Sequence, residues 1–97
     1  MTNSSSISLD DTVGKSENFV ESSVDQETIL MNLNEGNFSS LKSTGRRIWE
    51  MLDTPTKVSA ICSSLQDEFD VEKDVCEAQT VSFLNGLHSE GFIEVEA

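Results

Sequence analysis

The sequence predicts an α+β fold: a winged helix-turn-helix domain in which a three-stranded antiparallel sheet packs on three helices. Up to about residue 41, apolar residues lie in short runs broken by a glycine-containing turn, as in a meander of strands. From residue 43 the apolar spacing changes from two to 3.6, which is the period of helices. Three helical segments follow, and a meander followed by three helices is the layout of a winged helix-turn-helix domain. The 97 residues fit one domain.

The strongest strand is expected at residues 27–33, where the sequence ETILMNL is apolar and partly β-branched, as suits a strand covered on both faces. Residues 34–37 (NEGN) form the expected turn, because Gly36 can adopt the positive φ that a tight turn demands. Residues 38–41 are then the return strand. A further extended piece is expected at residues 19–22, which gives the meander the three strands that stability requires.

Three helices are expected after residue 43. The first is capped by Ser43 or Thr44 and ends before Pro55, which disfavours helical geometry in the residue before it. The second is capped by Thr56, and its apolar stripe is Val58, Ile61, Cys62, Leu65 and Phe69. The third begins near Glu72 and stops at Gly91, with the stripe Cys76, Thr80, Phe83, Leu84 and Leu87. A short final strand is expected at residues 92–95.

Residues 1–23 are expected to form a loosely ordered segment, and the folded domain to span residues 24–97. The segment is rich in Ser, Asp, Glu and Asn and poor in apolar residues, with one short strand expected at Ser6–Leu9. Its start has neither the basic cluster nor the apolar stretch of a secretory signal. No apolar run approaches the roughly 20 residues of a membrane span. The expected location is therefore the cytoplasm.

The charge of the chain argues against two classes of partner. The chain carries 18 acidic and 6 basic residues, a net charge of −12. Nucleic acid and anionic lipid surfaces both favour Lys and Arg, and the six basic residues form no stripe, so neither nucleic acid nor membrane is expected as a partner. A strongly acidic small protein suits basic peptides, basic enzymes or no charged partner.

The sequence predicts no enzyme, no cofactor and no metal site. A nucleophilic dyad needs a base, and the single histidine, His88, has no Ser or Cys at a motif spacing. Cys62 and Cys76 are expected to be small buried hydrophobic residues of predicted helices. The acidic residues between positions 67 and 77 lack the spacing of a calcium loop, and the glycines form no phosphate loop.

What remains is a candidate binding surface. The chain leaves the sheet directly after residues 38–41, so this strand is expected at an edge, where unpaired N–H and C=O groups can accept an added strand. The stripe of the third helix is flanked by small or weakly polar residues that let another backbone approach: Val75, Gln79, Ser82 and Gly86. The edge and the helix together would form a groove, and an ordinary protected edge is the alternative.

A series of short motifs favours the groove over an ordinary protected edge. Along the chain they are Ile29-Leu30-Met31-Asn32, Gly36-Asn37-Phe38 with Leu41, Thr44-Gly45, Ile48-Trp49-Glu50-Met51-Leu52-Asp53, Thr56-Lys57-Val58 with Ile61 and Leu65, Phe69-Asp70-Val71, Phe83-Leu84 with Leu87, and Gly91-Phe92-Ile93. In order and spacing they resemble the PqqD-like family, the leader-peptide recognition elements of ribosomally made, modified peptides. The resemblance covers about two-thirds of the chain.

The resemblance implies a non-catalytic adaptor that binds the leader of a precursor peptide as an extra strand and delivers it to an enzyme such as a leader peptidase. It implies that Asn37, Phe38, Ser39, Ser40 and Leu41 form the docking edge, and that Val75, Gln79 and Ser82 line the groove. The chain looks most like the free-standing members found with lasso peptides. The alternative setting is pyrroloquinoline quinone biosynthesis.

Three residues depart from the family pattern. Ser39 replaces the second residue of an aromatic pair, Lys42 stands where Asn is common, and Gln79 stands where an acidic residue is common. These departures concern which leader is recognised. Two other classes remain open: a winged-helix regulator that binds DNA, although Lys73 is the only basic residue of the third helix, and a structural subunit that binds no peptide.

Overall fold

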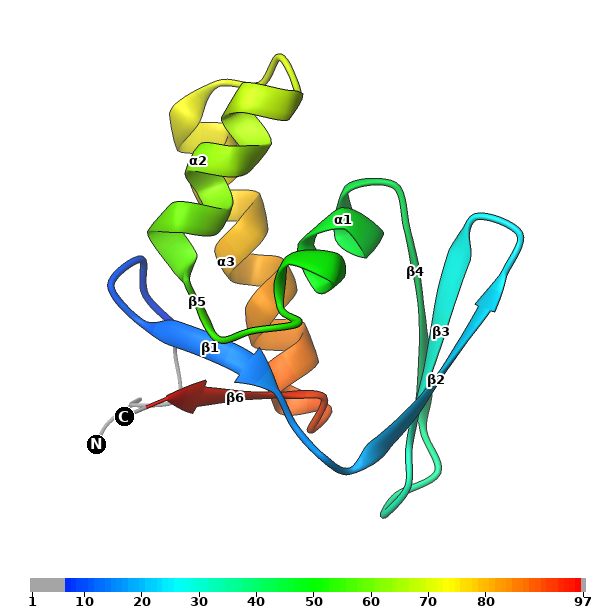
Figure 1. Cartoon of the computed structure of the whole chain (residues 1–97). Coiled ribbons are helices and arrows are strands. Elements are labelled where there is room, and N and C mark those ends of the chain that lie inside the picture. The colour runs from blue at the N-terminus through cyan, green and yellow to red at the C-terminus, as the bar shows by residue number, and fades with distance from the viewer. Residues whose placement is uncertain (1–6, 97) are drawn as a thin grey trace.

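The computed structural model describes residues 7–96, which form three helices and two three-stranded antiparallel sheets (Figure 1). Sheet A has the strand order β5-β1-β6, with bounds Thr56–Lys57, Thr12–Lys15 and Ile93–Glu96. Sheet B has the order β2-β3-β4, with bounds Phe19–Val24, Glu27–Asn32 and Phe38–Lys42. The helices are α1 (Thr44–Met51), α2 (Val58–Glu68) and α3 (Lys73–Ser89). The α+β class and the three helices are confirmed, whereas the strands divide between two sheets instead of one.

Sheet A joins the two ends of the described chain. β1 pairs with β6 over all four residues, Thr12 opposite Glu96 and Lys15 opposite Ile93, so the two strands lie side by side (Figure 1). Ile7 and Val13 are buried in the core. Residues 7–23 are therefore packed on the domain, which differs from the expected loose segment, and the expected boundary at residue 23 falls inside β2. Of the strand expected at Ser6–Leu9, Ser6 lies outside the described residues and Ile7–Leu9 are not in a strand.

Sheet B is the meander that the sequence predicts. β3 is its central strand, and Gly36 adopts a φ of 77° in the turn that leads to β4. The buried Asn32 side chain fixes this turn: Oδ1 accepts hydrogen bonds from the Asn34 N–H at 2.8 Å and the Glu35 N–H at 3.0 Å. Its Nδ2 donates to the Glu90 carbonyl at 2.7 Å. One amide thus ties the β3–β4 turn to the end of α3.

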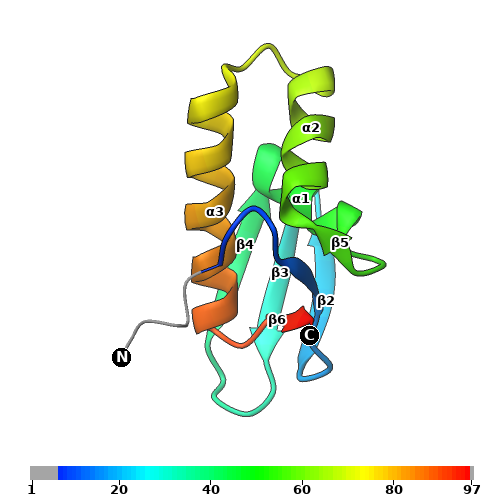
Figure 2. The ribbon, with the colours of Figure 1, turned by 90° about the vertical axis from the view of Figure 1, so that its left-hand side faces the viewer.

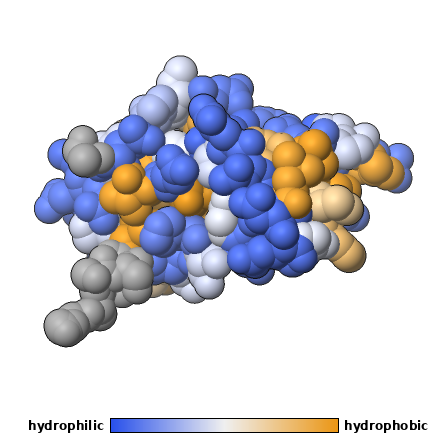
Figure 3. Space-filling view, turned by 90° about the horizontal axis from the view of Figure 1, so that it is seen from below, coloured by the Kyte–Doolittle hydropathy of each residue, from blue (hydrophilic) through white to orange (hydrophobic). Residues whose placement is uncertain are grey.

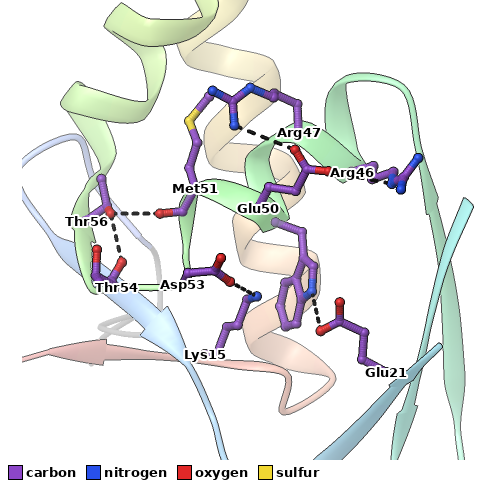
Figure 4. Close-up of polar contacts among 10 residues, drawn as sticks. Lys15, Glu21, Arg46, Arg47, Glu50, Met51, Asp53, Thr54 and Thr56 are labelled. Carbon is purple, nitrogen blue, oxygen red and sulfur yellow. Dashed lines mark hydrogen bonds and ion pairs between the residues drawn. The ribbon is translucent and has the colours of Figure 1, made fainter. Parts of the chain in front are cut away.

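Two helix starts differ from expectation in their chemistry. Ser43 precedes α1 as expected, but its side chain makes no capping hydrogen bond, and its φ is 55°. α2 is preceded by Lys57, not capped by Thr56, because Thr56 lies in β5. The Thr56 hydroxyl lies instead 2.8 Å from the Thr54 carbonyl and 3.1 Å from the Met51 carbonyl (Figure 4). It therefore holds the turn that follows α1.

Trp49 of α1 is the buried residue where both sheets meet the helices, with 1% of its surface exposed. Its ring packs edge-on against Phe19 of β2 at 5.2 Å, and its Nε1 donates to Glu21 Oε1 at 3.1 Å. Lys15 of β1 lies 4.5 Å above the ring and 2.6 Å from Asp53 (Figure 4). Aromatic packing and cation–π attraction together fix α1 between sheet A and sheet B.

Among residues 7–96, no helix is long and apolar enough to cross a membrane.

Candidate peptide-binding groove

The site is built on the outer edge of β4. No described strand pairs with β4 on the side away from β3. The hydrogen bond from the Asn32 N–H to the Asn37 carbonyl, 2.8 Å long, shows that these two residues form a hydrogen-bonded pair of the antiparallel ladder. Such pairs alternate, so the main-chain groups of Ser39 and Leu41 point to β3, opposite Leu30 and Thr28. Those of Phe38, Ser40 and Lys42 point outward.

α3 runs on the same side of the molecule as this open edge. In Figure 2, β4 is the outermost strand of sheet B on the side of the molecule where α3 runs. Val75, Gln79, Ser82 and Gly86 form one exposed stripe along α3. An added Cβ at Gly86 would meet nothing within 4 Å, so the helix backbone is accessible there. The small residues of this stripe leave room for a second chain.

A cavity of about 260 Å³ lies between the three helices. It is mostly apolar, and its lining residues come from α1, α2, the α2–α3 connection and α3: Thr44, Gly45, Ile48, Leu65, Phe69, Val71, Cys76, Gln79, Thr80 and Phe83. Phe69 belongs to this lining and not to the core stripe expected for α2, because it follows the last helical residue and is 43% exposed. The cavity has the size and character of a receptor for one large apolar side chain.

Close approach of α1 to α3 shapes the cavity. A Cβ added to Gly45 would lie 3.1 Å from Cε1 and 3.2 Å from Cζ of Phe83. Only a residue without a side chain therefore fits against the Phe83 ring without movement. Nothing in the sequence pattern predicts Phe83, Cys76 or Gly45 as groove residues, and the one signal that could have suggested the contact is the glycine in the first turn of α1.

The predicted site residues fall into three groups. Phe38 and Ser40 present main-chain groups at the open edge, and Gln79 lines the cavity. Val75 and Ser82 are exposed on α3 but do not line the cavity. The remaining three, Asn37, Ser39 and Leu41, have side chains on the helix-facing side of β4, where Leu41 is buried as part of the core. Leu41 thus positions the edge without offering main-chain groups to a ligand.

A second hollow, of about 810 Å³ and more open, lies between the β2–β3 turn and α1. Three basic and three acidic residues line it together with Gln26 and Ser43: Lys42, Arg46 and Arg47, and Asp25, Glu27 and Glu50. Lys42 lies 4.0 Å from Glu27, and Arg46 lies 3.7 Å from Glu50. Because these charges balance, the hollow does not define a site for an anion.

Arg47 connects α1 to the end of α2. Its Nε and Nη2 each donate to a Glu68 carboxylate oxygen at 2.8 Å. These hydrogen bonds raise the pKa of Arg47 and lower the pKa of Glu68. Burial raises the pKa of the Cys62 thiol. The main-chain carbonyl of Cys62 accepts a hydrogen bond from the Cys76 S–H, with 3.7 Å between Sγ and O. Within residues 7–96, no group of three His, Cys, Asp or Glu residues could hold a metal ion.

An unpaired edge strand beside a helix and an apolar cavity is the architecture of small α+β domains that bind extended peptides by strand addition. The chain belongs to the PqqD family: the family model described as Coenzyme PQQ synthesis protein D (PqqD) matches residues 27–93. Among solved structures, it is similar to the chain described as TbiB1 in complex with the TbiA(beta) leader peptide. The two share 26% identity and superpose with a TM-score of 0.78 over 87% of this chain and 98% of that chain. A comparison with curated proteins gives no match.

Proposed function

We propose that this protein is an adaptor that captures the leader of a ribosomal precursor peptide as a fourth strand of sheet B. The observation that carries the proposal is the open edge of β4, where Phe38, Ser40 and Lys42 direct their main-chain groups away from β3. Membership in the PqqD family supports it, as does the leader peptide bound to the structurally similar TbiB1.

The docked leader alternates between two environments. Side chains of an added strand point in turn to the helix-facing side of sheet B and to its outer side. One apolar leader residue on the helix-facing side would enter the cavity between Gln79 and Phe83. Main-chain hydrogen bonds to β4 would supply affinity that is independent of sequence, and this cavity would supply selectivity.

The adaptor would then present the leader to a modifying enzyme, such as a leader peptidase. Lasso-peptide biosynthesis is the setting we favour, on the likeness to TbiB1, with pyrroloquinoline quinone biosynthesis as the alternative. We further infer that α2, α3 and the strands of sheet B form a variant of the winged helix-turn-helix arrangement. In this pair of helices α3 is the second, and Lys73 is its only Lys or Arg, which does not suit a DNA major groove.

Hydrogen exchange of the backbone amides tests the proposal at single residues. The ligand is a synthetic peptide with the sequence of the leader encoded beside the gene for this chain. The amides of Phe38, Ser40 and Lys42 should exchange rapidly in the protein alone and become protected when the leader is bound. The amides of Ser39 and Leu41 already bond to β3 and serve as internal controls. A bound leader that leaves the first three amides unprotected would refute strand addition at this edge.

A further inference from the structure

The outer face of sheet B carries an uncovered row of apolar side chains. Val20, Met31 and Phe38 are direct cross-strand partners on β2, β3 and β4. They are 51%, 43% and 68% exposed, whereas their neighbours on the other face of β3, Leu30 and Asn32, are buried under the helices. Apolar side chains reach the surface on the side of the molecule where sheet B lies (Figure 3).

The apolar side chains of this row are contiguous, unlike the single exposed apolar residues that are common on protein surfaces. Cross-strand partners are in contact, so the three side chains form one strip across the whole width of the sheet. Val24 extends the same face near the β2–β3 turn, and it is 56% exposed. Contiguous exposed apolar surface of this kind marks an interaction site. None of the elements in residues 7–96 covers it.

The charges around the row indicate what binds there. The turns at the two ends of sheet B carry exposed acidic residues, Asp25 in one and Glu35 in the other. Lys42 is the only basic residue that β2, β3 or β4 contains, and it lies 4.0 Å from Glu27. Two copies of a chain with a net charge of −12 repel each other, so a homodimer through this face is disfavoured. The acidic turns at its ends instead favour a partner whose apolar patch is surrounded by Lys and Arg.

We infer that the outer face of sheet B, centred on Val20, Met31 and Phe38, docks the basic surface of the enzyme that processes the precursor. The inference rests on the proposed function and extends it. A leader strand added to β4 lengthens sheet B, and every second leader side chain then continues this same outer face beside Phe38 and Ser40. An enzyme on the face contacts the protein and the docked leader at once, which couples recognition to processing.

The test uses the full chain and two conservative replacements away from the open edge. V20T and M31Q together keep strand-compatible side chains of similar size but make the row polar. V95T is the matched control, because Val95 lies on β6 of sheet A and is also exposed, at 40%. The probes are the processing enzymes encoded beside the precursor gene, each purified and titrated with the protein with and without saturating leader.

The inference expects V20T/M31Q to bind an enzyme at least about tenfold more weakly than the wild type does, with leader affinity within about twofold. V95T should match the wild type in both titrations, and the affinity for the enzyme should fall as salt rises. Equal enzyme binding by V20T/M31Q and wild type, or no enzyme binding by a wild type that binds leader, would overturn the inference. So would sedimentation showing a wild-type dimer that V20T/M31Q abolishes. Failure of the proposed function would show separately, as a wild type that binds no leader.

Discussion

Replacing Ser40 with proline removes one main-chain donor from the open edge of β4. The Ser40 N–H points away from β3, so the change leaves the ladder inside sheet B intact. A docked leader strand would lose one hydrogen bond, and the leader carbonyl that accepted it would be left without a donor, which costs more than the net 0.5–1.5 kcal/mol, roughly, of an ordinary hydrogen bond. We expect a total loss of about 1–3 kcal/mol, which is about 5- to 150-fold in Kd.

Titration of a fluorescein-labelled leader, followed by anisotropy, measures this loss. Two variants separate its causes. S40A loses the 2.5 Å hydrogen bond from the Ser40 hydroxyl to Glu27 but keeps the N–H, so it should bind as the wild type does. S23P places the same ring on β2, at the opposite edge of the same sheet, where the Ser23 N–H also points outward. If S40P bound the leader as tightly as S23P does, with both folded by circular dichroism, the assignment of the docking edge to β4 would be wrong.

Three further changes test the groove and its frame. Q79R and S82W should each obstruct the α3 side of the groove and weaken leader binding at least about tenfold with the unfolding midpoint unchanged, because both side chains are exposed; normal titrations for both would remove α3 from the site. N32A should lower the free energy of unfolding by about 2–4 kcal/mol in urea denaturation, because three main-chain groups lose their buried partner; a loss below 1 kcal/mol, roughly, would contradict this reading. R47Q should raise the pKa of Glu68 toward its ordinary value, measured by NMR titration of the carboxyl carbon. The sign follows from the pair: a lowered Glu68 pKa stabilises the fold at neutral pH, and this contribution disappears as pH falls through that pKa.

Local sequence patterns correctly predict those elements whose structure depends on residues close together in the chain. Gly36 takes the predicted positive φ, and β3, β4 and the three helices lie close to their expected bounds. The open edge of β4 also followed from the sequence, because the chain turns into α1 directly after Lys42. These elements are specified by periodicity and turn residues that lie within a few positions of one another.

The rest depends on partners far away in the chain. β1 has a single fully apolar side chain, Val13, and becomes a strand because β6 pairs with it some eighty residues later. Thr56 is the exception, because it precedes an apolar stripe as a cap would, but its hydroxyl bonds to the Met51 and Thr54 carbonyls, only five and two residues before it. The cavity has no pattern of its own, because it arises where Gly45 meets Phe83 from another helix. No local rule describes such contacts.

The pairing of β1 with β6 has a consequence for biosynthesis of the protein. β1 is the middle strand of sheet A, yet β5 and β6 are both translated after it, and β6 comes after every other element described. A nascent chain still attached to the ribosome can assemble sheet B and pack α1 on it. Val13 then still lacks its pairing partner on β6, Val95. Closure of sheet A, and burial of this part of the core, must therefore follow synthesis of residues 93–96.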